Sequence, residues 1–512
     1  GVIHCLSVKR RPRARTQDML FAAAALAAAV WSRPALAGEA APPPSLQDAI
    51  AALLARDGCD VERTGICVIA DDGATRAEIS ADTPLAPASN LKLLTTAAAL
   101  HNLGEEYIFQ TTLTATAAPR GGTIAGDLIV RGGGDPNISG RFYSDPEAVL
   151  RAWAKALRAA GIHTITGDLV ADDTFFDDER FCPSWDRAQE ARWYSAQVSA
   201  LSLNDNCVDI TVTPGAADGP ALVSVAPDSP AVVLRGAPVT AAKAKTKIIV
   251  TRRSGTNEIT LSGTIDKNAG PWRDYVAIDD PAMFFAHTFA AVLRREGIAV
   301  RGAVRRAARP APAPPPGAQL LIRHDSPLAR ALPVINKNSQ NLHAELLLRA
   351  MGAVKFGEGS AAAGARAIRA CLDTLLVPCE GLVIEDGSGL SAGNRVTART
   401  LARLLHAARG REWFPPYLDS LPLAGIDGTL KSQRRFRTAP QLHGCVHAKT
   451  GNIARVSALS GYVRHGERLW SFALLFNEPL RRKGARMNAL QDAIVREIHA
   501  AMESGPAEGG AA

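Results

Sequence analysis

The sequence predicts a mixed α/β (α+β) protein, in which both ends of the chain build an antiparallel sheet flanked by helices, around a large β-rich insertion. Three observations predict this class. Hairpin patterns lie near both ends, at residues 65–80 and 456–476. An amphipathic helix pattern lies outside each hairpin, at residues 46–54 and 487–498. The long segment 105–308 between them is dominated by strand patterns.

Composition and charge exclude several classes of protein. The 512 residues are 47% hydrophobic and 21% charged, which excludes a disordered or collagen-like chain. The length favours two or more domains. The net charge is +8, and residues 1–37 carry six basic side chains against one acid. No comparable basic run follows, so we expect no nucleic-acid partner.

Residues 1–37 have the pattern of a secretory signal peptide. A basic run at residues 9–15 precedes an apolar, Ala-rich run, and Ala35 and Ala37 supply the small residues of a cleavage site. The apolar run is short for a membrane span, so we expect no stable transmembrane anchor. An uncleaved amphipathic anchor is the alternative. We expect cleavage, and a periplasmic or otherwise extracytoplasmic protein that starts near Gly38.

The cysteines fit an oxidising compartment without proving it. The chain has eight, of which Cys5 lies in the signal peptide. Proximity along the chain suggests three local disulfides, although connectivity does not follow from sequence. The pairs are Cys59 with Cys67, Cys182 with Cys207, and Cys371 with Cys379, which leaves Cys445 free.

The elements before the insertion follow from spacing and turn signals. Ser45 can cap a helix over residues 46–54, where apolar residues recur three and four apart. The hairpin over residues 65–80 turns at residues 71–73 (Asp-Asp-Gly). Residues 91–100 have a helical pattern.

The insertion has strand patterns interrupted by two helix patterns, near residues 146–160 and 281–296. Its clearest strands are residues 124–130, 169–172, 208–212, 248–252 and 259–265. A stiff, solvated connector follows (RPAPAPPP). The predicted organisation is a signal peptide (1–37), a discontinuous domain (45–104 and 317–504), an inserted region of one or two subdomains (105–308) and a Pro-rich connector (309–316).

Ser89 and Lys92 form a Ser-x-x-Lys motif at the start of the 91–100 helix pattern. Spacing of three places both side chains on one helical face. A serine hydroxyl is a weak nucleophile until a neighbouring base takes its proton. Burial and nearby positive charge can lower the pKa of a lysine enough for it to be that base. Alone the motif is weak, because Ser and Lys three apart recur by chance.

Two further short motifs offer complementary chemistry. Ser339 and Asn341 flank Gln340 ahead of a helix pattern, and supply a hydroxyl for proton relay and an amide for holding a carbonyl. Taken alone, this turn is better explained as a helix cap. The Lys449-Thr450-Gly451 motif supplies a charge and a hydroxyl for a carboxylate, and a glycine that lets a backbone approach a strand edge. On its own it is an ordinary turn or strand.

The order of the three motifs makes them specific. Ser-x-x-Lys, Ser-x-Asn and Lys-Thr-Gly in this order are the signature of β-lactamases and penicillin-binding proteins. Here they begin at Ser89, Ser339 and Lys449, behind a signal peptide pattern. Each motif alone is weak evidence for this class of protein, but the three in this order are strong evidence for it.

At these residues the chain resembles the serine D-Ala-D-Ala carboxypeptidase/endopeptidase family of low-molecular-mass penicillin-binding proteins (class C, peptidase family S13). The resemblance runs from about residue 45 to 500, and segment 87–100 around Ser89 is similar to the family's active-site segment. Further similar blocks are residues 126–136, 199–206, 386–391 and 421–430.

The resemblance implies a serine β-lactamase/transpeptidase-like catalytic domain, and acyl transfer with no metal and no organic cofactor. Ser89 would attack the carbonyl between two D-alanines of a peptidoglycan stem peptide. Lys92 would act as the base and Ser339 would relay the proton to the leaving D-Ala. Asn341 would hold the acyl side of the peptide. β-Lactam antibiotics would acylate the same serine.

The resemblance also implies a subsite for the terminal carboxylate, formed by Lys449 and Thr450 beside Gly451. Backbone N–H groups of Ser89 and Asn452 would form the oxyanion hole. Relatives commonly carry Thr or Ser where this chain has Asn452, so a hydroxyl contact to a carboxylate would be lost or altered.

Asp177 is our candidate for a further substrate contact. Members with this insertion can use one of its acids to recognise the amine of diaminopimelate, and Asp177 lies in an acidic stretch, residues 172–179. A solvated turn acid is an equally good interpretation.

Two other functions and one other site remain as alternatives. A serine β-lactamase would share the acyl-enzyme, and a non-catalytic peptidoglycan-binding protein would share the fold. The large insertion argues against the first, and the intact set of motif residues argues against the second. His443, Cys445 and His447 would share a strand face as a metal cluster, but we favour a strand that leads into Lys449.

Overall fold

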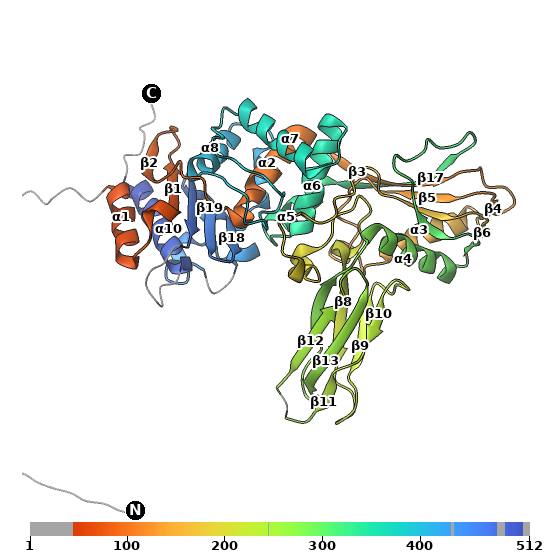
Figure 1. Cartoon of the computed structure of the whole chain (residues 1–512). Coiled ribbons are helices and arrows are strands. Elements are labelled where there is room, and N and C mark those ends of the chain that lie inside the picture. The colour runs from red at the N-terminus through yellow and green to blue at the C-terminus, as the bar shows by residue number, and fades with distance from the viewer. Residues whose placement is uncertain (1–44, 244, 432–434, 479–486, 505–512) are drawn as a thin grey trace, which may run out of the picture. The chain divides into compact units, whose positions relative to one another are not determined.

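A five-stranded antiparallel sheet joins the two ends of the chain (Figure 1). The computed structural model describes residues 45–243, 245–431, 435–478 and 487–504. The strands, in sheet order, are β18 (Val446–Ile453), β19 (Val456–His465), β20 (Arg468–Asn477), β1 (Thr64–Ile69) and β2 (Thr75–Ile79). β1 pairs with β20, with Ile66 opposite Leu474, so the predicted sheet built from both ends is confirmed.

Helices bury both faces of this sheet. α1 (Leu46–Asp57) and α10 (Met487–Ser504) cover one face, and α2 (Leu91–Leu103) and α8 (Ala398–Ala408) cover the other (Figure 1). Successive residues of β1 alternate between the two layers, because side chains of a strand point to opposite faces in turn. The predicted α/β class is therefore correct.

The terminal elements form where the periodicity predicts them. Ser45 caps α1 by accepting the backbone N–H of Asp48 at 3.2 Å. The two predicted hairpins are β1–β2 and β19–β20. α10 buries Leu490, Ile494 and Ile498, three of the residues that define its predicted apolar face.

More helices pack on the α2 side of the sheet and carry part of the site. They are α5 (Leu328–Asn336), α6 (Asn341–Phe356), α7 (Ala361–Thr374) and α9 (Phe414–Ser420). α6 is almost wholly buried through its first three turns, polar residues included. Buried polar groups must be hydrogen-bonded, so this helix imposes specific partners on its surroundings.

The inserted region has its own sheets and its own core. Its main sheet has the order β16 (Val304–Arg306), β7 (Leu169–Asp172), β5 (Leu128–Arg131), β3 (Ile108–Ala115) and β17 (Gln319–Pro327). The two predicted helices are α3 (Ala148–Ala159) and α4 (Pro281–Arg295), and Trp153 of the first packs on Phe285 and Phe289 of the second. The predicted strand 124–130 is two strands, β4 (Thr123–Ile124) and β5.

The remaining strands of the inserted region form three small sheets. The first sheet contains β14 (Trp272–Ala277), β8 (Cys207–Thr213) and β9 (Leu222–Ala226). The second contains β10 (Val233–Arg235), β11 (Val239–Ala241), β12 (Lys247–Arg252) and β13 (Glu258–Asp266). The third contains β4, β6 (Thr164–Ile165) and β15 (Ala299–Val300).

The Pro-rich connector lies within the inserted region. Residues 309–316 join β16 to β17, and β17 returns to pair with β3 along eight residue pairs, from Ile108–Pro327 to Ala115–Gln319. The sheet of the insertion therefore extends to Pro327, ten residues beyond the predicted start of the second catalytic segment at 317. A proline run marks a solvated connection, but it does not show which sheet the next strand joins.

The predicted disulfides do not form in the structure. All seven described cysteines are free thiols. Cys67 packs in the layer of α2 and α8, whereas Cys59 packs in the layer of α1 and α10 on the other face of the sheet. Cys182 and Cys207 likewise belong to separate apolar clusters. Cys371 and Cys379 pack in one cluster but are free thiols as well, so proximity along the chain was a poor guide.

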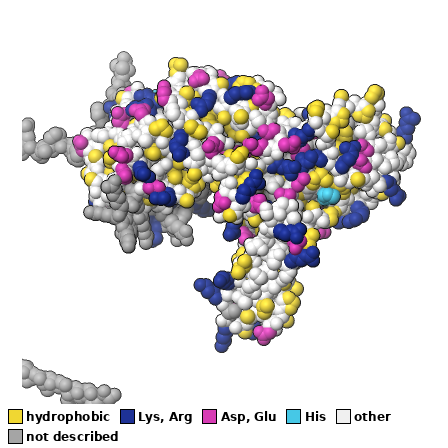
Figure 2. Space-filling model, viewed as in Figure 1, with side chains coloured by type: hydrophobic (Ala, Val, Ile, Leu, Met, Phe, Trp, Pro, Cys, Tyr) yellow, Lys and Arg dark blue, Asp and Glu magenta, His cyan; other side chains and the backbone are white. Residues whose placement is uncertain are grey.

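The surface charge is mixed on the face that Figure 2 shows. On the face shown in Figure 2, Lys and Arg side chains are scattered among Asp and Glu. In the part of the chain that the structure describes, no helix combines the length and the apolar character needed to cross a membrane. The predicted signal peptide and Cys5 lie outside the described residues.

Candidate active site

Ser89 lies in a short 3₁₀ turn, Ala88–Asn90, immediately before α2. Ala88 has a φ of 46°, in the left-handed region that non-glycine residues seldom occupy. The Asn90 amide donates to the backbone carbonyl of Lys449 at 3.0 Å, which fixes the turn against β18. A Cβ on Gly451 would lie 2.9 Å from the Pro87 carbonyl, so the glycine of Lys-Thr-Gly permits this close contact.

Lys92 is fully buried one turn into α2, where its Nζ meets three oxygens. It lies 3.1 Å from Ser89 Oγ, 2.7 Å from Asn341 Oδ1 and 2.7 Å from the carbonyl oxygen of Ser388. Burial lowers the pKa of Lys92 to about 7, although the carboxylates of Asp386 and Glu345 oppose the shift.

The three contacts of Lys92 satisfy an ammonium and also accommodate a neutral amine. An ammonium donates three hydrogens, whereas an amine donates two and keeps one lone pair. The two acceptors at 2.7 Å, on Asn341 and Ser388, can take both N–H groups. The lone pair then faces the hydroxyl of Ser89, the third and longest contact. A base and a nucleophile are therefore within proton-transfer distance.

Ser339 and Lys449 form the second half of the site. Lys449 Nζ donates to Ser339 Oγ at 3.0 Å and to the carbonyl of Thr450 at 2.9 Å. Ser339 has a φ of 59°, so its turn holds the hydroxyl in an uncommon backbone geometry. Burial lowers the pKa of Lys449 well below its usual value, and the charge of Lys92 adds to this effect. A bound anion would favour the ammonium form of Lys449.

Asn341, Thr450 and Asn452 border this group. The Asn341 amide donates to the backbone carbonyl of Tyr194, from the inserted region, at 2.8 Å. Thr450 Oγ1 donates to Thr429 Oγ1 at 2.9 Å. Asn452 is exposed near the end of β18 and lines a cavity of about 750 Å³ with Arg437 and other residues.

Asp177 is not brought to this group. Its carboxylate is half-exposed and faces Arg349 of α6 at 3.6 Å, and its backbone N–H donates to Gly359. None of these contacts reaches Ser89 or Lys449. Its predicted role stays a prediction.

A buried network that sequence reasoning missed supports the Ser-Gln-Asn turn. Gln340 caps α6 by accepting the Leu342 N–H at 3.1 Å, and its amide donates to Asp205 of the inserted region at 3.1 Å. The same carboxylate contacts His343 at 3.0 Å and the guanidinium of Arg141, and these partners hold the pKa of Asp205 well below its usual range. The partners of Asp205 lie 64 to 138 positions away along the chain, so only the similar block 199–206 hinted at their role.

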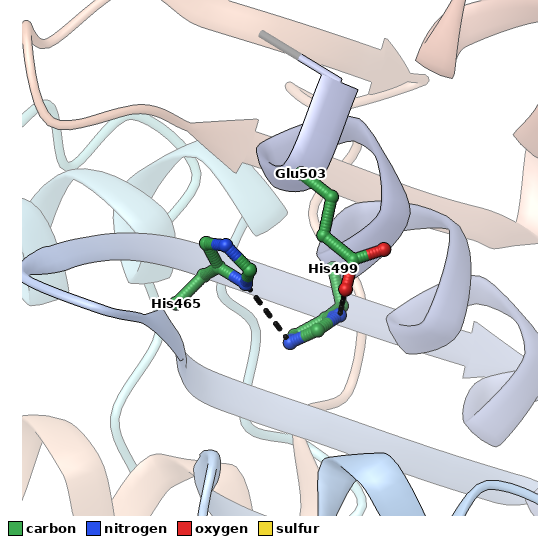
Figure 3. A group of neighbouring side chains, drawn as sticks. All are labelled: His465, His499 and Glu503. Carbon is green, nitrogen blue, oxygen red and sulfur yellow. Dashed lines mark hydrogen bonds and ion pairs between the residues drawn. The ribbon is translucent and has the colours of Figure 1, made fainter. Parts of the chain in front are cut away.

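The three residues that we weighed as a metal cluster and did not favour, His443, Cys445 and His447, do not lie on one strand. His447 lies on β18, but His443 and Cys445 precede the strand and follow a 3₁₀ turn. Within the described residues a different group, His465, His499 and Glu503, has ligand atoms within 4.8 Å of one another. Figure 3 shows the ring of His499 between the other two, 3.4 Å from His465 and 3.5 Å from Glu503. Each nitrogen of His499 thus has a protein partner, through a hydrogen bond with His465 and an ion-pair contact with Glu503.

Comparison with known proteins gives consistent findings. The model of the D-Ala-D-Ala carboxypeptidase 3 (S13) family matches residues 46–498. A D-alanyl-D-alanine carboxypeptidase from an Actinomadura species is 36% identical over 466 residues, covering 88% of this chain and 83% of its own. The D-alanyl-D-alanine carboxypeptidase DacB of Haemophilus influenzae is 28% identical over 398 residues, covering 76% of this chain and 79% of its own.

A solved structure shares the fold. The crystal structure of penicillin binding protein 4 from Haemophilus influenzae superimposes with a TM-score of 0.74 at 24% identity. The match covers 88% of this chain and 99% of that one. The inserted region is therefore part of the shared fold.

Proposed function

The chain belongs to the D-Ala-D-Ala carboxypeptidase (S13) family and is a serine-type D-Ala-D-Ala carboxypeptidase; from that premise we propose that it acts on peptidoglycan stem peptides through an acyl-enzyme on Ser89. The observation that carries the proposal is the 3.1 Å contact between Lys92 Nζ and Ser89 Oγ, in which both N–H groups of a neutral amine have other acceptors. In that form the lone pair of the amine faces Ser89 Oγ and can accept the serine proton.

Acylation would begin with transfer of the Ser89 proton to Lys92. Ser89 Oγ forms a bond to the carbonyl carbon between the two D-alanines, and backbone N–H groups of Ser89 and Asn452 receive the oxyanion. The C–N bond then breaks, and the terminal D-Ala amine takes a proton through Ser339, whose hydroxyl lies 3.0 Å from Lys449 Nζ. Water hydrolyses the ester and frees Ser89.

The substrate carboxylate would bind to Lys449 and Thr450. Its negative charge would offset the burial that lowers the pKa of Lys449, so binding favours the ammonium form. Asn341 uses one amide hydrogen for Tyr194, and a side-chain amide has two. The second hydrogen is available for a carbonyl on the acyl side of the peptide.

Further parts of the proposal follow the family resemblance. We expect β-lactams to acylate Ser89, cross-link cleavage between D-Ala and diaminopimelate to accompany carboxypeptidase action, and the protein to work outside the cytoplasm. A role for Asp177 in binding the diaminopimelate amine stays a prediction.

The test combines two assays on the purified protein. A peptide ending in D-Ala-D-Ala should lose one D-Ala, and incubation with benzylpenicillin should leave a persistent adduct detectable by intact mass. Rapid accumulation of hydrolysed penicillin with little standing adduct would instead indicate a β-lactamase. Neither turnover nor adduct would indicate a binding protein.

The rate of acylation is expected to rise with pH through about 7 and then level off. Lys92 accepts a proton only as the neutral amine, and burial lowers its pKa to about 7, so the active form predominates above that pH. The second-order rate constant for benzylpenicillin, measured from about pH 5.5 to about pH 9, checks this. A profile that stays flat across neutrality would rule out Lys92 as the base with this pKa.

A further inference from the structure

The loop of residues 386–391 is built around a buried carboxylate, that of Asp386. One carboxylate oxygen accepts the backbone N–H of Gly389 and the amide of Asn394, both at 2.8 Å. The other accepts the backbone N–H of Ser391 at 2.6 Å and the indole N–H of Trp185 at 2.8 Å. Four donors around one carboxylate leave the loop little freedom.

Glu345, from α6, supplies a second buried carboxylate to the same loop. Its oxygens accept the backbone N–H of Gly387 at 2.9 and 3.0 Å and that of Ser388 at 2.8 Å. Its side chain is 2% exposed, as is that of Arg349, whose guanidinium lies 3.8 Å away. The N–H groups of three successive residues, 387 to 389, thus all point to carboxylates.

The carbonyls of this loop point the other way, to α2. The Gly387 carbonyl accepts the hydroxyl of Thr95 at 2.7 Å, and the Ser388 carbonyl accepts Lys92 Nζ at 2.7 Å. The peptide group that holds Lys92 therefore has its N–H, on Gly389, bound to Asp386. The preceding peptide has its N–H, on Ser388, bound to Glu345.

The two glycines let this loop fit between the helices. A Cβ on Gly389 would lie 1.9 Å from the carbonyl of Ala88, the residue before Ser89, and its φ is +80°. A Cβ on Gly387 would lie 2.6 Å from the carbonyl of Ala344 in α6. Close contacts with α6 on one side and with the turn before Ser89 on the other thus require glycine at positions 387 and 389.

From this geometry, and resting on the proposed function of Lys92, we infer that Glu345 and Asp386 are positioning residues for the reaction. They hold the Ser388 carbonyl where it binds one N–H of Lys92, and thereby aim the lone pair of the amine at Ser89. Displacement of that carbonyl would let the amine rotate away from the hydroxyl. Misplacement of a reacting group by about 1 Å can cost about 10²-fold in rate.

The charges of the pair act on Lys92 as well. Both carboxylates favour the ammonium form and oppose the effect of burial on the pKa of Lys92. Burial also raises the pKa of Glu345 to about 7, and Asp386 adds to that shift. Removing the charge at position 345 therefore lowers the pKa of Lys92. The rise of the acylation rate with pH, which we call the acid limb of the profile, then moves to lower pH.

The experiment compares Glu345→Gln and Asp386→Asn with wild type by acylation with benzylpenicillin across pH. In each variant an amide N–H₂ faces backbone N–H groups that need an acceptor, so the loop shifts. We expect acylation per folded molecule to fall about 10²-fold at the plateau, with the acid limb displaced to lower pH. Folded fraction comes from thermal unfolding monitored by circular dichroism.

Two further variants separate positioning from stability. Glu147→Gln is the matched control, since Glu147 is also buried and accepts a backbone N–H at 2.8 Å and an arginine at 2.7 Å, but in the inserted region. It should lose stability and keep the wild-type rate and pH profile. Trp185→Phe removes one donor to Asp386 and keeps an aromatic ring, so it should fold and still slow acylation several-fold.

Each outcome decides the inference. The positioning role would be overturned if the acylation rate per folded molecule and the acid limb were unchanged in Trp185→Phe and in whichever of Glu345→Gln and Asp386→Asn folds. That result would leave the proposed function intact. If wild type itself formed no adduct and released no D-Ala, the proposed function would fail first. Slower acylation with a displaced acid limb, absent from Glu147→Gln, would establish the role.

Discussion

Replacing Ser89 with alanine is expected to abolish adduct formation with benzylpenicillin and to reduce D-Ala release by about 10⁴-fold or more. The substitution removes the only atom that can form the ester. It should leave the fold intact, because Lys92 keeps its two contacts at 2.7 Å with Asn341 and Ser388. Intact mass spectrometry and a D-Ala release assay measure the two effects.

The matched control for this change is Ser224→Ala, an exposed serine on β9 in the inserted region. It should acylate like wild type. An adduct of the same mass on the Ser89→Ala protein would show that another residue is the nucleophile, and the proposed mechanism would be wrong.

Replacing Lys92 with methionine should lower the acylation rate by about 10²- to 10⁴-fold, the usual contribution of a general base. Methionine preserves the length of the buried side chain and removes the amine. The rise of the rate through pH 7 should also vanish, because the base whose deprotonation produces it is gone. Stopped-flow or mass measurements of acylation at several pH values provide both readouts.

Lys355→Met is the control for loss of a lysine charge, since Lys355 is exposed on α6 and contacts Asn102. Its rate and pH profile should match those of wild type. A Lys92→Met protein that retained the wild-type pH dependence would assign the base to another group, with Lys449 as the first to examine.

Local patterns predicted the elements whose burial is periodic. The apolar spacing of α1 and α10 and the turn signals of the β1–β2 and β19–β20 hairpins all lie within short windows, and the structure has these elements. β17 is different, because its membership of the inserted sheet depends on pairing with β3, about two hundred residues earlier. The cysteines failed for a different reason, since neighbours in sequence such as Cys59 and Cys67 pack on opposite faces of the sheet.

The site shows the same division between local and long-range information. Motif order predicted Ser89, Lys92 and Asn341, and the structure places both partners of Lys92 within 3.1 Å. The sequence could not show the Ser388 carbonyl as the third partner, since the direction of a backbone carbonyl depends on Glu345 and Asp386. His343 and Glu345 lie among apolar residues of α6, where periodicity alone does not separate a buried polar partner from an exposed one.

The pairing of β3 with β17 has a consequence for how the enzyme forms. Ile108 lies opposite Pro327, so the chain leaves the catalytic domain and returns to it at adjacent points. Closing an unstructured loop of that length costs entropy that grows with the logarithm of its length. A folded insertion has already brought its ends together. The folded insertion thus holds the ends of the two catalytic segments side by side, which lowers the entropy cost of bringing the Ser-Gln-Asn turn to the serine.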